Sequence, residues 1–277
     1  MWLDFALIMT IWQAIIVGIV QGLAEFLPIS SSGHIVLTQM LLGIEENSLS
    51  FEIVLHLGTL LSVLIYFRAS LWKLCQSLWT REMKEERMMI VWLGVATVPA
   101  VIAYKLFSDS FKAAYENPVL VSGLLLMTAA LLFVPKIVKN KTSNVGAKSS
   151  LWMGLAQAFA ILPGISRSGS TIAAGLVSGV KAEKAAEFSF LMSIPAIAGG
   201  FVLNLKEEAE LQGSWANALE SCTSDAYIWG AVASAVVGLL AISLAMKVVK
   251  QGKLEYFSYY LITVSIAGMI YFTVNPV

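Results

Sequence analysis

Long apolar stretches are the feature that most constrains this chain. Six of them are approximately long enough to cross a bilayer: 51–67, 88–107, 119–135, 186–205, 226–246 and 257–275. A helix of about 20 residues spans the hydrocarbon and satisfies its own backbone hydrogen bonds there. Of the 277 residues, 58% are hydrophobic and only 13% are charged, whereas soluble domains carry roughly 25% charged residues. The sequence therefore predicts an all-α membrane protein with six transmembrane helices.

Two further apolar regions, 5–44 and 151–180, are each interrupted by a polar string. The first string is Pro-Ile-Ser-Ser-Ser-Gly-His at 28–34, and the second is Pro-Gly-Ile-Ser-Arg-Ser-Gly-Ser-Thr at 163–171. Proline and glycine break helices, and irregular backbone at membrane depth must be buried in protein or line a wet cavity. We expect two broken or re-entrant helical hairpins. The alternative is an ordinary turn outside the membrane, which gives the same sidedness.

The two interrupted regions resemble each other. With an offset of 136, residues 18–33 match 154–169 at seven of sixteen positions, including the Ser-x-Ser-Gly of both polar strings. Each half, about 1–140 and 141–277, then holds one hairpin and three spans. Because three is odd, the second half enters the membrane from the opposite face. We predict a single membrane domain of inverted-topology repeats, which bring broken helices together near the bilayer midplane.

The basic residues test this topology. Fourteen of the 18 lie in the loops 68–87, 136–150, 181–185 and 247–256, which the span count places on one face. The other face receives three, Lys105, Lys112 and Lys206. By the positive-inside rule the lysine-rich face is cytoplasmic, so both termini are expected outside.

Charge totals and cysteines add further limits. The 18 acidic residues balance the 18 basic ones, so the total indicates no nucleic-acid partner. Cys75 and Cys222 fall on opposite faces of the predicted topology, which excludes a disulfide between them. The N-terminus lacks a basic region, and we expect the first apolar stretch to be retained.

Titratable residues inside apolar segments are costly and mark candidate sites. Arg167 lies where the second broken helix resumes, and exposed N–H groups at a helix start favour anions. Its guanidinium fork suits phosphate, and neighbouring hydroxyl groups could donate as well: Ser166, Ser168, Ser170 and Thr171. The alternative is an arginine that only locks the two halves together through Glu25.

The first break offers complementary groups. Glu25 and Gln21 share a helical face and could ligate a hard divalent cation through oxygen. Three hydroxyls (Ser30, Ser31 and Ser32) and the imidazole of His34 follow. These groups suit a metal-assisted phosphoryl transfer in which a serine attacks with His34 as base, His34 attacks directly, or His34 activates water. Three further residues could orient the site or pair across the bundle: Glu52, His56 and Glu187.

At these residues the chain resembles the undecaprenyl-diphosphate phosphatase family of the bacitracin-resistance type. The matching strings are Gln-Gly-Leu-Ala-Glu-Phe-Leu-Pro-Ile-Ser-Ser-Ser-Gly-His at 21–34 and Pro-Gly-Ile-Ser-Arg-Ser-Gly-Ser-Thr at 163–171. The resemblance runs essentially from end to end. The Ser-Gly-His string also resembles type 2 phosphatidic acid phosphatases, but those need a second catalytic histidine in a late motif. This chain has only His34 and His56.

The resemblance implies an enzyme of the bacterial inner membrane that releases phosphate from a C55 polyprenyl diphosphate and recycles the lipid carrier of peptidoglycan synthesis. It implies a divalent cation, Mg²⁺ or Ca²⁺, and a pocket that opens outward. The catalytic set carried over is Glu25, Ser31, His34, Ser166, Arg167 and Thr171. Many members have glutamate where this chain has Gln21, which leaves Glu25 as the main carboxylate.

Other classes fit parts of the pattern. Inverted repeats with broken helices also describe transporters and flippases, here of a polyprenyl phosphate, for which Ser31 and His34 would be dispensable. A purely structural bundle would tolerate joint replacement of Arg167 and Glu25 by apolar residues. The sequence leaves the oligomeric state open, a homodimer included.

Overall fold

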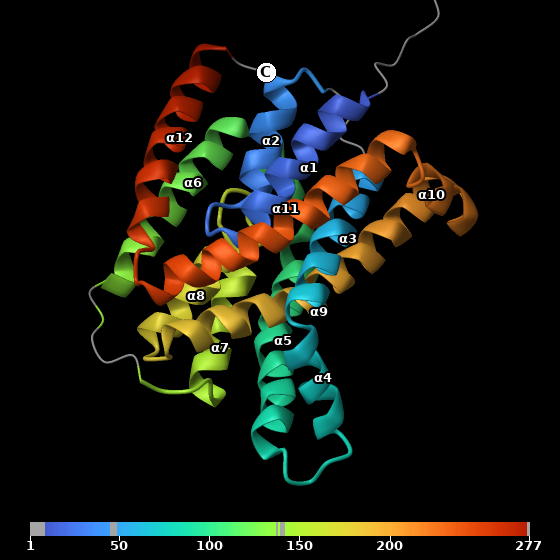
Figure 1. Cartoon of the computed structure of the whole chain (residues 1–277). Helices are drawn as coiled ribbons and strands as arrows, with labels where there is room; N and C mark the ends of the chain where they lie inside the picture. The colour runs from blue at the N-terminus through green and yellow to red at the C-terminus, as the bar shows by residue number, and fades with distance from the viewer. Residues whose placement is uncertain (1–8, 45–48, 137, 139–141, 276–277) are drawn as a thin grey trace, which may run out of the picture.

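The computed structural model describes residues 9–44, 49–136, 138 and 142–275. Residues 5–8 of the first predicted hairpin therefore lie outside the described residues, as do Lys139 and Lys141 of the predicted cytoplasmic face. Within these ranges the chain is helical throughout, and its one β-bridge joins Ser143 to Val180 (Figure 1). The predicted all-α class is confirmed.

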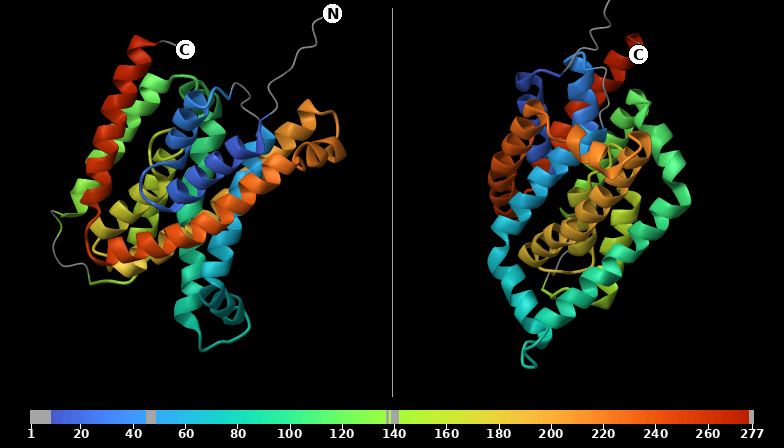
Figure 2. Two further views of the ribbon diagram at one scale, coloured as in Figure 1. Left: turned by 45° about the horizontal axis from the view of Figure 1, so that its top comes forward. Right: turned by 90° about the vertical axis from the view of Figure 1, so that its right-hand side faces the viewer.

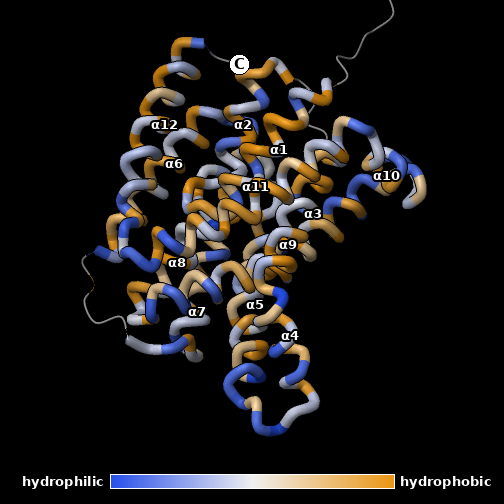
Figure 3. The backbone as a smooth tube through the Cα atoms, viewed as in Figure 1, coloured by the Kyte–Doolittle hydropathy of each residue, from blue (hydrophilic) through white to orange (hydrophobic). Residues whose placement is uncertain are grey.

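Among the described residues, six helices are long and apolar enough to cross a membrane, as predicted. They are α3 (Leu49–Tyr66), α5 (Lys84–Tyr115), α6 (Pro118–Phe133), α9 (Ala182–Leu211), α11 (Asp225–Lys250) and α12 (Glu255–Val274). Apolar residues run along most of their length (Figure 3). Large apolar side chains remain exposed on their outer faces, such as Val98, Val236 and Ile270. A surface of this kind needs lipid around it.

Both interrupted regions form helix–break–helix units. The first consists of α1 (Ile11–Phe26) and α2 (Ser31–Leu41), and the second of α7 (Ala147–Phe159) and α8 (Arg167–Val177). Each returning helix begins at a serine whose hydroxyl accepts a hydrogen bond from a glycine N–H three residues later, Ser30 from Gly33 and Ser166 from Gly169. Such N-caps satisfy backbone donors that the break would otherwise leave unpaired. The re-entrant position in a bilayer stays a prediction.

Three short elements were not predicted: α4 (Arg68–Ser77), the 3₁₀ turn η1 (Val134–Lys136) and α10 (Trp215–Ser221). The predicted loop 181–185 is also largely helical, since α9 begins at Ala182. Its sequence, Ala-Glu-Lys-Ala from 182, consists of strong helix formers. These differences leave the span count unchanged.

The molecule has two distinguishable ends (Figures 1 and 2). We call one of them the lysine-rich end. It holds the α4–α5 connection, the residues before α7, the start of α9 and the α11–α12 connection. α1 begins and α12 finishes at the opposite end, which we call the terminal end. Six spans and two hairpins require this arrangement.

The helices pack across the two halves of the chain. α1 lies on α11 while α7 lies on α5, α3 packs on α9, and α6 packs on α12. Glycines allow the closest crossings: a Cβ on Gly18 would lie 2.2 Å from the carbonyl oxygen of Gly230, and one on Gly154 would lie 2.6 Å from that of Ala96. If the two halves are exchanged, the α1–α11 pair becomes the α7–α5 pair, and the α3–α9 and α6–α12 pairs each map onto themselves. The boundaries of the repeat itself stay a prediction.

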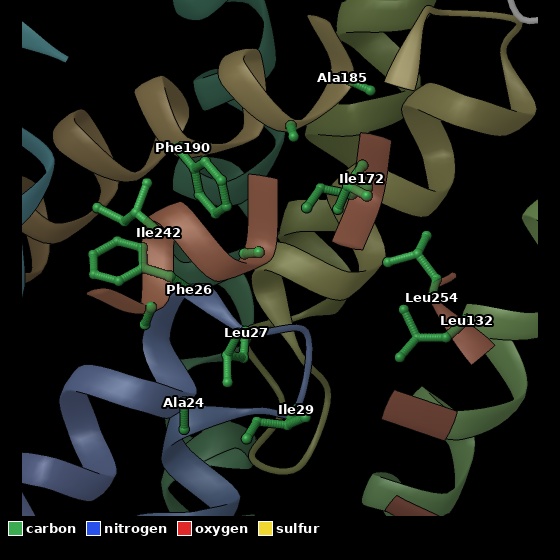
Figure 4. Packing of buried hydrophobic residues seen from close by; sticks show 14 of the residues in the cluster. Ala24, Phe26, Leu27, Ile29, Leu132, Ile172, Ala185, Phe190, Ile242 and Leu254 are labelled. Carbon is green, nitrogen blue, oxygen red and sulfur yellow. The ribbon is translucent and has the colours of Figure 1, made fainter. Parts of the chain in front are cut away.

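The main core includes residues of the first break and of the helix that follows the second (Figure 4). Leu27 and Ile29 of the first break belong to the same buried cluster as Ile172 of α8 and Phe190 of α9. The rings of Phe26 and Phe190 meet edge to face at 5.8 Å. Close packing of this kind fixes backbone positions. The core therefore holds the irregular segments in place.

Candidate functional site

The two breaks, distant in sequence, are in direct contact. The hydroxyl of Ser168 donates to the carbonyl of Leu27 at 3.1 Å. Thr128 of α6 binds the backbone of the second break through two hydrogen bonds. Its hydroxyl donates to the carbonyl of Gly164 at 2.8 Å and accepts from the N–H of Ser166 at 3.0 Å. Buried irregular backbone needs such partners. The polar strings thus form one rigid unit.

Ser30 has a backbone conformation that non-glycine residues rarely adopt, with φ of 72°. Residues held in the left-handed region cost free energy and cluster at functional sites. Here the strained residue turns the chain so that α2 starts against the end of α1. As a result Ser31 comes within hydrogen-bond distance of Glu25.

Arg167 and Glu25 form a largely buried ion pair between the two halves of the chain. The Arg167 Nη2 donates to Glu25 Oε1, and the two side chains are 15% and 7% exposed. The other terminal nitrogen of the guanidinium, Nη1, is buried without a partner among the described residues. A buried charged donor without an acceptor is unfavourable. The arginine therefore has unused capacity for an anion.

The second oxygen of Glu25 is also occupied. Oε2 accepts a hydrogen bond from the Ser31 hydroxyl at 2.6 Å and a longer one from Gln21 Nε2 at 3.3 Å. A carboxylate this close to a hydroxyl can take its proton. Glu25, rather than a histidine, is thus the titratable side chain that accepts a hydrogen bond from Ser31.

A cavity of about 280 Å³ opens beside this pair. Among its lining residues are the groups that bear the chemistry: Glu25, Ser30, Ser31, Ser32, His56, Tyr115, Ser166, Arg167 and Asn204. Tyr115 ends α5, and Asn204 lies in the last third of α9, both toward the terminal end. One guanidinium, several hydroxyls and a carboxylate around one small space suit a phosphate group.

The two histidines are placed differently from the prediction. His34 is absent from the cavity lining. Its Nδ1 bonds the carbonyl of Ser30 at 2.8 Å, and its Nε2 bonds the hydroxyl of Tyr260 on α12 at 2.9 Å. A carbonyl only accepts, so Nδ1 carries the proton and Nε2 accepts from Tyr260. Both ring nitrogens of His34 are thus hydrogen-bonded to groups other than Ser31.

His56 lines the cavity instead. Its Nδ1 donates to the carbonyl of Glu52 at 2.8 Å, which leaves Nε2 as the acceptor in the neutral ring. The sequence placed His56 only in a supporting role. The signal was a titratable side chain in an apolar span, but spacing alone could not say which histidine faces the cavity.

Other predicted residues lie outside the cavity. Ser168 and Thr171 are buried in structural contacts, the latter with the Ser189 hydroxyl at 2.6 Å. Ser170 faces a separate groove. Glu187 accepts from Ser70 and Lys184 near the lysine-rich end. Their positions lend no support to direct roles in phosphate binding or in orienting the site.

The structure also adds residues that the sequence did not single out. Asn204 is a polar residue in an apolar span, but it does not titrate, so the rule that found His56 passed over it. Tyr115 and Tyr260 carried no such signal, because tyrosines at span ends are common anchors. Only the fold brings them to the two histidine-bearing helices.

The donor set for a metal is small. Among the described residues no three His, Cys, Asp or Glu side chains gather into a metal cluster. Glu25 and Gln21 are the oxygen donors at the site, and Gln21 Oε1 is buried without a partner in the described chain. One carboxylate and one free amide oxygen fit a hard cation only if other oxygens complete its shell.

Comparison with known proteins shows which family the chain resembles. The sequence profile described as "Bacitracin resistance protein BacA" matches residues 14–267. The chain is similar to proteins named undecaprenyl-diphosphatase: it is 40% identical to that of Treponema denticola over 95% of this chain and 98% of the relative. It is 40% identical to that of Caldicellulosiruptor bescii, over 91% and 94%. With that of Methanobrevibacter smithii the identity is 39%, also over 91% and 94%.

Proposed function

This chain belongs to the bacitracin resistance protein BacA family, and from that premise we propose how its residues divide the work. The protein is a multi-pass membrane phosphatase that hydrolyses undecaprenyl diphosphate to the monophosphate and inorganic phosphate. This reaction recycles the lipid carrier of peptidoglycan synthesis. Its substrate combines a long apolar tail with a diphosphate head group, so the head must meet polar groups within a membrane protein.

The unused nitrogen of Arg167 is the observation that carries the proposal. One arm of the guanidinium holds Glu25 while the other is buried without an acceptor in the described chain. A terminal phosphate in the adjacent cavity would supply that acceptor and share the cation. Ser30, Ser32 and Ser166 would donate further hydrogen bonds, as would the N–H groups at the start of α8. Tyr115 and Asn204 line the same cavity.

Ser31 is the proposed nucleophile and Glu25 its base. The Ser31 oxygen attacks the terminal phosphorus as its proton passes to Glu25, and the bond from phosphorus to the bridging oxygen breaks. The departing lipid monophosphate takes the proton from Glu25. Water then attacks the phosphorus of the seryl phosphate as Glu25 takes a proton from it. The bond between phosphorus and the Ser31 oxygen breaks, inorganic phosphate leaves, and Glu25 returns the proton to the Ser31 oxygen. Arg167 stabilises charge on the transferring group, and the accepting Nε2 of His56 orients the attacking water.

A divalent cation, Mg²⁺ or Ca²⁺, fits beside Glu25 and Gln21 once phosphate oxygens complete its shell. Mg²⁺ in phosphate sites is commonly held by one or two carboxylates and the substrate. When bound, the cation would neutralise charge on the diphosphate. Since Gln21 carries no charge, Glu25 is the one carboxylate among the described residues that line the cavity.

The proposed location is the bacterial inner membrane, with the lysine-rich end in the cytoplasm and both termini outside. Fourteen basic residues in the loops of one face support this orientation. The cavity is lined from the terminal end by Tyr115 and Asn204, which favours an opening to the outside.

Phosphate release from purified protein in detergent micelles tests the function. Micelles have no two sides, so only hydrolysis, and not transport, gives a signal. Arg167→Ala is expected to lower kcat by about a hundredfold or more, the usual loss when a donor to a developing anion is removed. Glu25→Ala should do at least as much. Full activity of both variants would remove the assignment.

A further inference from the structure

A second and larger hollow lies away from the catalytic cavity. It is a groove of about 910 Å³ between α6, α7 and α8, and it extends to the residues before α7 at the lysine-rich end. It shares no lining residue with the catalytic cavity. Arg167 in the cavity and Ser170 in the groove are one helical turn apart on α8. The catalytic reaction uses nothing in this groove.

The groove has a polarity gradient along α7. Lys148 lies at its outer end, Trp152 one turn further in, and Leu155 and Phe159 follow on the same side of the helix. Val177 of α8 and Leu131 of α6 face them. A cation, then an interfacial aromatic ring, then apolar side chains is the order that a lipid meets from its head group inward.

The length of the groove matches one leaflet. From Lys148 to Phe159 the helix rises about 16 Å, roughly half of the 30 Å hydrocarbon thickness. Lys148 makes no ion pair with the residues that the structure describes. We propose that this groove binds an anionic glycerophospholipid of the adjacent leaflet, with its phosphate at Lys148 and an acyl chain along Trp152 and Leu155.

Charge and size favour a glycerophospholipid over the polyprenyl product. A phosphodiester carries one negative charge, which matches the single lysine of the groove. A phosphate monoester carries nearly two at neutral pH, and a C55 chain is much longer than one leaflet. The groove is therefore a lipid site separate from the substrate site, and it stands whether or not the proposed catalytic roles hold.

Fluorescence quenching tests the site in the full-length protein. The protein is reconstituted with phosphatidylglycerol or phosphatidylcholine that carries bromine on its acyl chains. The difference between wild type and Trp152→Phe isolates the signal of Trp152 from the other seven tryptophans. We expect half-quenching at about fivefold lower mole fraction of the anionic lipid, the preference that one lysine near a lipid phosphate provides.

Two matched variants test whether Lys148 causes the preference for the anionic lipid. Lys148→Gln should abolish it, whereas Lys181→Gln, which removes an exposed lysine at the same end but outside the groove, should retain it. Equal quenching by both lipids in wild type would overturn the proposal and leave only ordinary annular lipid. A preference that survives Lys148→Gln would also overturn it. Displacement of the brominated anionic lipid by much lower mole fractions of polyprenyl monophosphate would show that the occupant was wrongly chosen.

Discussion

At the scale of single residues, the site depends on a few side chains with defined partners. Glu25 is held from one side by Arg167 and from the other by Ser31 and Gln21. The two histidines, which look equivalent in sequence, divide into one that is fully hydrogen-bonded and one that faces the cavity. Because the partners differ, we expect substitutions of neighbouring residues to have different effects on activity and stability.

Ser31→Ala should lower kcat by about a thousandfold, because it removes the proposed nucleophile from the base that contacts it. Ser170→Ala is the control, since Ser170 carries a hydroxyl of the second polar string, lies outside the cavity, and its hydroxyl has no hydrogen-bond partner among the described residues. It should retain most of the activity. Phosphate release in micelles measures both, and equal losses would argue against a special role for Ser31.

Replacing each histidine by alanine should affect phosphate release and Tm differently. His56→Ala is expected to lower phosphate release while leaving Tm nearly unchanged, because His56 lines the cavity. His34→Ala should lower both, since it removes the contacts to Ser30 and Tyr260 that fix the start of α2. Each lost buried hydrogen bond costs roughly 1 kcal/mol. A His34→Ala protein of unchanged Tm would contradict the structural role.

At the scale of helices, close crossings set the positions of the breaks. α1 carries Glu25 near its end and lies against α11 through Gly18. Any side chain there would push the two helices apart. The spaced glycines therefore connect the repeat seen in sequence with the geometry of the site.

Gly18→Ala should destabilise the protein by about 1–3 kcal/mol, the range for overpacking, because its Cβ would lie 2.2 Å from a backbone oxygen. The matched control is Gly123→Ala on α6, where a Cβ meets nothing within 4 Å. The thermal midpoint in detergent measures both. A tolerated Gly18→Ala would show that α1 and α11 are not as close as described.

Sequence patterns predicted these elements unequally. The six spans follow from length and hydropathy, and both breaks from proline, glycine and serine. α4 and α10 were missed because short polar helices between spans have no apolar signal. The pairing of Arg167 with Glu25 was foreseen as an alternative, but the placement of His34 against Tyr260 depends on how α2 meets α12, which no local pattern encodes.

At the scale of the whole molecule, the two ends face different compartments in the proposed topology. Cys75 on α4 lies near the lysine-rich end and is exposed. Cys222 follows α10 near the terminal end and is partly buried. The natural cysteines therefore report sidedness without engineering.

A membrane-impermeant maleimide applied to intact spheroplasts should label Cys222 and spare Cys75 until the membrane is permeabilised. Labelling of Cys222 should be slow at neutral pH, because burial raises the pKa of its thiol and the thiolate is the reactive form. The rate should rise with pH as the thiolate fraction grows. Labelling of Cys75 alone from outside would show that the chain has the opposite orientation in the membrane.

The central claim is that both breaks hold one diphosphate between Arg167 and Ser31. An experimental structure with a non-hydrolysable polyprenyl diphosphate analogue tests it most directly. We expect Arg167 Nη1 to lie about 3 Å from an oxygen of the terminal phosphate and the Ser31 hydroxyl to face the phosphorus of that phosphate. A diphosphate bound elsewhere, with Arg167 still paired only to Glu25, would contradict it.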